Sequence, residues 1–186
     1  MDENCGIFKK LKELALTSGA TRAEVIPTEQ IETDPSFRLL CEQNTCGAYG
    51  KNWACPPDVG EIHELIARFG TYRYILVYQT VYALEDGFDI EGMETAKIQH
   101  GKLVQIMRKR VGEMDLPRCL HLGAGGCDVC PVCARVTDEP CRFPDRMTAS
   151  LESYGVNVSK LAKAAGMKYI NGQNTVTYFG AVLFDL

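Results

Sequence analysis

The sequence lacks several features that define common classes of protein. No uninterrupted apolar run reaches the roughly 20 residues that a membrane-spanning helix needs. The opening residues, MDENCGIFKK, contain no apolar core of a signal peptide. Basic residues are not in excess, because 20 Lys and Arg stand against 24 Asp and Glu, for a net charge of -4. Nucleic-acid-binding proteins normally carry a basic face. We therefore expect a cytoplasmic protein with no membrane segment and no nucleic-acid partner.

The motifs of common hydrolases are missing as well. The sequence contains neither the G-x-S-x-G of serine hydrolases nor the H-E-x-x-H of zinc proteases. Its three histidines, His63, His100 and His121, are far apart, and none forms a recognisable nucleophilic pair with a cysteine. No lysine of a phosphate-binding loop follows the glycine-rich stretch 123–126. The sequence thus gives no support for hydrolase chemistry.

Hydrophobic periodicity predicts a chain in which helices and strands interleave. Apolar residues at helical spacing predict helices over residues 6–18, 61–69, 93–114, 147–154 and 158–165. Runs rich in Val, Ile and Tyr predict two short strands within 21–34, a central strand at 71–84, a short strand at 119–122, and a C-terminal hairpin turning at Asn171-Gly172. We expect one α/β or α+β domain over residues 1–186, with a mixed sheet flanked by helices.

Cysteine is the residue type that stands out. Disulfides are rare in the reducing cytosol, and an odd number of cysteines cannot be used up in pairs. A cysteine-rich pattern in an intracellular protein indicates metal binding or catalysis instead. The nine positions are Cys5, Cys41, Cys46, Cys55, Cys119, Cys127, Cys130, Cys133 and Cys141.

The later group of cysteines lies in a predicted loop over residues 119–146. Its spacing is Cys127-x2-Cys130-x2-Cys133-x7-Cys141. Three cysteines two residues apart open the bacterial ferredoxin motif, in which a tightly wound loop delivers thiolates to iron. In ferredoxins the fourth cysteine follows after three residues and precedes a proline, whereas here it follows after seven. The spacing predicts four thiolate ligands without predicting a ferredoxin.

The earlier group, Cys41-x4-Cys46-x8-Cys55, lies in a predicted ordered loop over residues 37–57. Three thiolates need a fourth ligand to close a metal site. The candidates are Cys119, Cys141, Cys5, a histidine and an external molecule. By count Cys119 completes a second set of four, although a cysteine in a strand is about as often a small buried hydrophobic residue. A metal left with three thiolates would be open to other ligands.

Iron and zinc are the two metals to weigh. Zinc sites made of four cysteines are usually built from two C-x2-C pairs separated by a spacer. A tight triplet with a distant fourth cysteine fits an iron–sulfur cluster better. We therefore expect one or two iron–sulfur clusters of the [4Fe-4S] type, with zinc as the alternative.

Three segments of the chain resemble a known family. They are CGAYGKNWACPP at 46–57, GAGGCDVCPVC at 123–133 and PCRFPDRMTASLESYGVNV at 140–158. The resemblance runs from about Cys41 to Val158, and the family consists of uncharacterised bacterial and archaeal proteins described as predicted metal-binding proteins. It leaves Cys5 and Cys119 outside its motifs and implies no activity. It implies metal bound by Cys41, Cys46, Cys55, Cys127, Cys130, Cys133 and Cys141.

Two functional classes follow from these expectations. In the first, the protein carries electrons for an anaerobic enzyme and docks with a redox partner protein. In the second, an open iron at the first cysteine group gives a catalytic or regulatory site. A zinc-stabilised interaction module is a further alternative. We favour an electron carrier or accessory metalloprotein over an enzyme, because no acid–base residues visibly accompany the first cysteine loop.

Overall fold

The structure is a computed structural model that describes residues 3–186, with side chains from residue 6 onward. Its centre is a five-stranded mixed sheet with the order β1-β2-β5-β3-β4. Only β3 and β4 pair in parallel, and the other neighbours are antiparallel. The strands are β1 (Arg22–Pro27), β2 (Tyr74–Ala83), β3 (Cys119–Gly123), β4 (Ala149–Ser150) and β5 (Thr175–Phe184). The expected α+β fold with a mixed sheet is confirmed.

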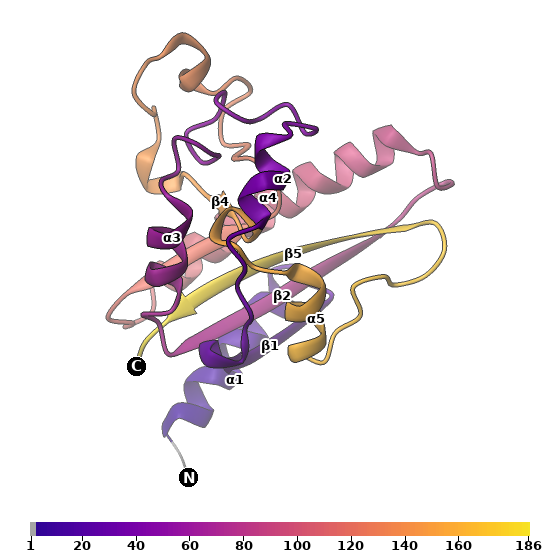
Figure 1. Ribbon diagram of the computed structural model, residues 1–186. Coiled ribbons are helices and arrows are strands. Elements are labelled where there is room, and N and C mark those ends of the chain that lie inside the picture. The colour runs from indigo at the N-terminus through magenta and orange to yellow at the C-terminus, as the bar shows by residue number, and fades with distance from the viewer. Residues whose placement is uncertain (1–2) are drawn as a thin grey trace.

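Helices cover both faces of the sheet (Figure 1). One face is covered by α1 (Glu3–Thr17) and by the long α4 (Ile90–Gly112). The other is covered by α3 (Ile62–Phe69) and α5 (Val158–Ala164). These four helices were predicted from the apolar spacing to within a few residues. None of the described helices is both long enough and apolar enough to cross a bilayer.

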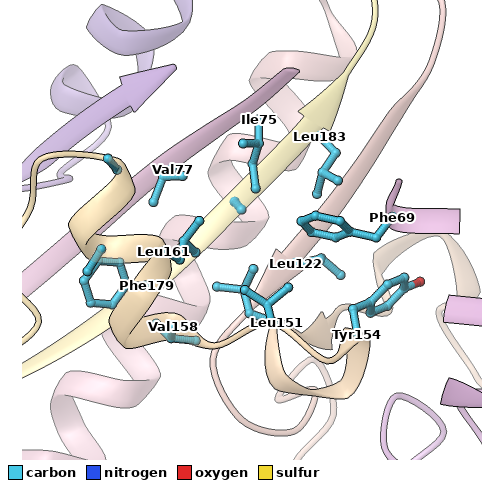
Figure 2. Packing of buried hydrophobic residues seen from close by; sticks show 14 of the residues in the cluster. Phe69, Ile75, Val77, Leu122, Leu151, Tyr154, Val158, Leu161, Phe179 and Leu183 are labelled. Carbon is cyan, nitrogen blue, oxygen red and sulfur yellow. The ribbon is translucent and has the colours of Figure 1, made fainter. Parts of the chain in front are cut away.

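The central strand β2 explains why both layers form. Its side chains alternate between the two faces, as in any strand. Ile75 and Val77 pack with Phe69 and Leu161 on the α3 and α5 side (Figure 2). Leu76 and Tyr78 pack into the other cluster, with α1 and α4. These four neighbouring residues of β2 are fully buried. Because the strand is buried on both faces, its sequence is a nearly continuous apolar run.

Four local predictions were wrong. The segment 147–154 forms β4 and the short 3₁₀ helix η4 (Glu152–Tyr154) instead of a helix. Residues 21–34 hold one strand, after which the 3₁₀ helix η1 (Thr28–Gln30) begins. The loop expected over 37–57 begins with α2 (Phe37–Glu42). No strand precedes Asn171-Gly172, so the expected C-terminal hairpin does not form, and β5 pairs along its length with β2 instead.

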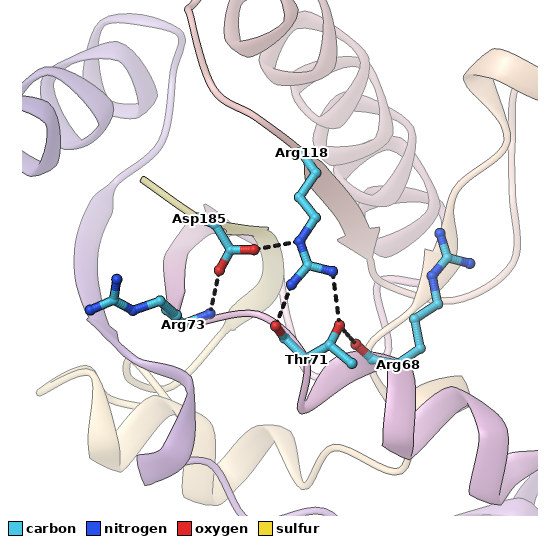
Figure 3. A network of polar contacts seen from close by, with 5 residues as sticks. All are labelled: Arg68, Thr71, Arg73, Arg118 and Asp185. Atoms are coloured by element: carbon cyan, nitrogen blue, oxygen red, sulfur yellow. Dashed lines mark hydrogen bonds and ion pairs between the residues drawn. The ribbon is translucent and has the colours of Figure 1, made fainter.

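A polar network fixes the beginning of β3 (Figure 3). The Arg118 guanidinium donates to the Asp185 carboxylate after β5, and to both the carbonyl and the hydroxyl oxygen of Thr71 after α3. It also lies 4.3 Å from the centre of the Tyr72 ring. The other Asp185 oxygen accepts from the backbone N–H of Arg73 at 2.9 Å. The start of β3 is thus held rigidly, and β3 carries the chain from there into the second cysteine loop.

Candidate metal centre

The second cysteine loop leaves the sheet at the end of β3 and returns to it at β4. Short turns dominate its path, with the 3₁₀ helices η2 (Ala134–Thr137) and η3 (Pro144–Arg146) as its only regular elements. A small cavity of about 20 Å³ lies between this loop and Asn52 and Trp53 of the first cysteine loop. The four cysteines that line this cavity are Cys127, Cys130, Cys133 and Cys141. The structure therefore brings the second predicted group together.

The first cysteine loop is ordered by its own hydrogen bonds. The backbone turns at Asn44, which has a φ of 52°, and the Asn44 side chain accepts from the Tyr49 N–H at 3.0 Å. The N–H of Gly50 donates to the Pro56 carbonyl at 2.9 Å, which closes the loop. Cys41 is half-buried on α2, Cys46 is exposed, and Cys55 is buried. The three cysteines thus span the distance from solvent to the protein interior.

The two cysteine loops pack against each other on the side of the sheet where α3 lies (Figure 1). Three contacts join them. The Asn52 side chain donates to the Cys127 carbonyl at 3.0 Å, and the Trp53 indole donates to the Glu139 carbonyl at 2.9 Å. An ion pair of 2.8 Å links Asp58 with Arg135, whose guanidinium also lies over the Trp53 ring. Segments some 75 to 86 residues apart in the sequence therefore form one unit.

Gly126 lies close to the side chains of the first loop. A Cβ atom at this position would stand 3.1 Å from Nδ2 of Asn52 and 3.4 Å from Sγ of Cys55. A larger residue would therefore require the Asn52 side chain to shift by a few tenths of an ångström. The glycine of the GAGGC motif therefore serves the contact between the loops.

Burial and neighbouring thiols govern the ionisation of Cys55. Burial first, and then the nearby Cys46, Cys41, Cys127 and Cys133, raise the pKa of the Cys55 thiol to about 12. Members of both cysteine groups thus surround this residue. Metals bind the thiolate form, so a metal entering here must displace protons.

Cys119 lies elsewhere. It is the first residue of β3, opposite Phe184 of β5, and it packs against the α1 and α4 cluster. Burial first, and then the carboxylate of Asp185, raise the pKa of its thiol. The second cysteine loop begins beyond Gly123, at the opposite end of the strand. Cys119 is thus half-buried against the core and away from the second cysteine loop, and the side chain of Cys5 falls outside the described residues.

None of the three histidines joins the cysteine groups. His63 is exposed on α3, and His100 is buried on α4. His121 is buried on β3, where burial and the nearby Arg108 lower its pKa to about 3. The same charge on Arg108 would oppose a metal cation at His121.

Among the side chains of residues 6–186, no three of His, Cys, Asp or Glu lie close enough together to hold a metal ion as they stand. The donor set nevertheless fits a thiolate-bound metal, since four cysteines line one small cavity. A cavity of this size admits a single ion or water molecule. A cluster of several atoms requires the loop of residues 127–141 to widen.

Two residues of this region escaped the sequence analysis. Asn52 joins the loops, and nothing in its sequence context distinguishes it from other loop asparagines. Glu152 on η4 lies near Cys41, and burial raises the pKa of its carboxyl group. Its role could not be read from the sequence because more than a hundred residues separate it from Cys41.

A family model described as "Predicted metal-binding protein (DUF2284)" matches residues 24–184. The chain belongs to this family. The match includes both cysteine loops and every strand except the beginning of β1. No curated protein and no solved structure matches the chain. Membership in the family of predicted metal-binding proteins establishes metal binding as the expected property and leaves the metal open.

Proposed function

We propose that the protein is an iron–sulfur protein with a [4Fe-4S] cluster held by Cys127, Cys130, Cys133 and Cys141. The observation that carries the proposal is that these four cysteines all line the same small cavity. The C-x2-C-x2-C spacing favours iron over zinc, as in the ferredoxin motif. Such a cluster would supply one-electron transfer.

The first cysteine group would form a neighbouring site. Cys55 lies near Cys127 and Cys133, so the two sites would lie next to each other. Because Cys119 lies against the core at the far end of β3, we do not expect it to be the fourth ligand. A metal held by Cys41, Cys46 and Cys55 alone would be open to an external ligand. Glu152, near Cys41, favours this alternative of a catalytic or regulatory site.

Electron transfer to a partner protein is the function that the surface supports best. Large apolar residues surround the second loop and are exposed on it: Val132 by 61%, Val136 by 56% and Phe143 by 44%. Leu39 and Leu40 on α2 add to them from the first loop's side. Such a surface suits transient docking of a redox partner. A reducing compartment such as the cytoplasm would keep the thiols available for metal.

Anaerobic purification tests the proposal. We expect brown protein that contains iron and acid-labile sulfide in equal amounts, because a cubane cluster holds both in that ratio. Cys130→Ser should lose most of this iron. The matched control is Cys119→Ala, which removes a half-buried cysteine outside both loops and should keep the iron while lowering stability.

Two results would decide against parts of this proposal. Stoichiometric zinc without sulfide, after anaerobic reconstitution with iron and sulfide, would overturn the iron–sulfur assignment. Loss of a cluster in Cys119→Ala would mean that Cys119 is the fourth ligand at the first cysteine group, which would then not be open to an external ligand. An added small thiol that changes the electron-spin signal of wild-type protein would favour the open site over the carrier.

A further inference from the structure

A second and larger cavity lies beside the cysteine loops, between α4 and the glycine-rich stretch 123–126. Its volume is about 480 Å³, within the range of small-molecule sites. Helix α4 forms one wall, with Ile98, Gly101 and Gln105. The backbone of 123–126 forms the opposite wall. Neither the cysteine chemistry nor the family description accounts for this cavity.

Apolar residues on α4 line much of the cavity. Ile98 is 48% exposed and Ile106 is 44% exposed, although both are large and apolar. Val104 and Val129 add further apolar surface. A ligand with an apolar body would remove these side chains from water, which is favourable in proportion to the area covered.

The charged residues around the cavity favour an anion. Lys102 and Arg146 line it, and among the described residues neither forms an ion pair. The one acidic residue of the lining, Asp128, is paired with Lys97 at 3.5 Å. The cavity therefore carries a small excess of positive charge. It suits a singly charged group better than a phosphate that carries two charges.

His100 is a buried residue of the cavity lining. It is only 2% exposed, and its Nδ1 lies 2.8 Å from the hydroxyl oxygen of Thr80. Burial lowers the pKa of its imidazole to about 4, so it adds no positive charge to the cavity at neutral pH. The positive charge at the cavity therefore comes from Lys102 and Arg146.

The cavity shares a wall with the candidate metal centre. Cys127 and Val129 line both this cavity and the small one that the four cysteines surround. A molecule bound here would therefore touch a residue that we assign to the metal. Contact with the metal centre would come through Cys127 alone.

From these contacts we infer that the cavity binds a small organic carboxylate with an apolar body. Lys102 and Arg146 attract the carboxylate, and the isoleucines of α4 cover the apolar part. The binding depends on the fold of α4 and the glycine-rich stretch. It does not depend on which metal the cysteines hold.

Fluorine NMR titration of the purified, metal-loaded protein tests this inference. The probe is 4-(trifluoromethyl)benzoate, and its neutral counterpart is 4-(trifluoromethyl)benzamide. We expect the wild-type protein to bind the benzoate saturably. The benzamide should bind the wild-type protein about tenfold more weakly, and the benzoate should bind Arg146→Gln about tenfold more weakly, because each change removes one favourable charge contact. Metal content is measured on the same samples, so zinc-loaded protein that binds the benzoate would support this site while overturning the iron assignment.

Two glycines of α4 provide the variants that locate the site. A Cβ atom at Gly101 meets nothing within 4 Å, so Gly101→Phe should fold, gain helix propensity and fill the cavity. We expect it to weaken benzoate binding at least about tenfold. Gly112→Phe, at the end of the same helix and outside the cavity, should bind like wild type. Wild-type binding by Gly101→Phe, equal binding of the benzamide, or no saturable binding at all would overturn the inference.

Discussion

One pair of residues in the centre of the sheet shows how closely the core is packed. Gly180 of β5 lies directly opposite Tyr78 of β2. The Tyr78 ring lies over the glycine, and a Cβ atom at Gly180 would stand 2.4 Å from Cζ of that ring. Tyr78 is fully buried among the residues of α1 and α4. A Cβ atom at Gly180 would therefore require the buried Tyr78 ring to shift.

Replacing this glycine should destabilise the protein. We expect Gly180→Ala to lower the free energy of unfolding by about 1–3 kcal/mol, which is the usual effect of forcing an extra carbon into a filled core. Urea unfolding followed by circular dichroism measures it.

The matched control is Gly6→Ala on α1, where a Cβ atom meets nothing within 4 Å. This variant should be more stable than wild type by up to about 1 kcal/mol, because alanine favours helix. Unchanged stability of Gly180→Ala would mean that the Tyr78 ring is free to move aside.

Helices and strands that are long enough to show a regular apolar pattern could be predicted from the sequence. The apolar spacing of α1, α3, α4 and α5 is strong because each helix buries one face against the sheet. The apolar run of β2 reflects burial on both faces. The sequence fails at short elements, because a two-residue strand such as β4 has no period to detect.

Part of the candidate site could likewise be predicted from the sequence, and part could not. The spacing of Cys127, Cys130 and Cys133 reveals a local loop that can wrap one metal centre, and the structure brings these residues to one cavity. The contact between the two cysteine loops depends on hydrogen bonds between residues far apart in the sequence. Asn52 and Glu139 have no local signal for such a contact, so it could not be predicted.

The contact between the loops leads to a prediction about metal retention. Asn52→Ala removes the hydrogen bond to the Cys127 carbonyl and one to the N–H of Ala54. We expect it to release metal to a chelator about 10 to 100 times faster than wild type, as is typical when a group that orients a metal ligand is lost. Metal release is followed by the absorbance of the thiolate-bound metal.

Asn171→Ala is the control for this experiment. The Asn171 side chain also donates two hydrogen bonds, to Lys168 and Thr177, in a turn outside the cysteine loops. It should lose some stability and keep its metal. Equal release from both variants would mean that global destabilisation, and not the contact between the loops, controls retention.

For the molecule as a whole, buried histidines link stability to pH. Burial lowers the pKa of His100 from 6.5 to about 4. Between these values the unfolded chain binds a proton that the folded protein does not. Stability is therefore full above pH 6.5 and falls as the pH drops towards 4, by up to about 1.4 kcal/mol per pH unit for this one residue.

Unfolding by urea at several pH values between 7 and 4.5 measures this dependence. In His100→Gln the slope of unfolding free energy against pH should be flatter than in wild type by about 1 kcal/mol per pH unit. His63→Gln removes an exposed histidine of α3 and should leave the slope unchanged. The slope is the deciding quantity, because any substitution in the core also shifts the stability at pH 7. An unchanged slope in His100→Gln would contradict a neutral buried imidazole.

The parallel pairing of β3 with β4 has a consequence for how this protein can evolve. Parallel neighbours cannot be joined by a tight hairpin, because the chain must return along the length of the strand before it pairs again. A long connection over residues 124–148 is therefore demanded by the topology, whether or not it binds anything. Doubling the length of such a connection costs only about 0.6 kcal/mol in closure entropy. Lineages could thus lengthen this segment, or exchange its ligands, while inheriting the sheet unchanged.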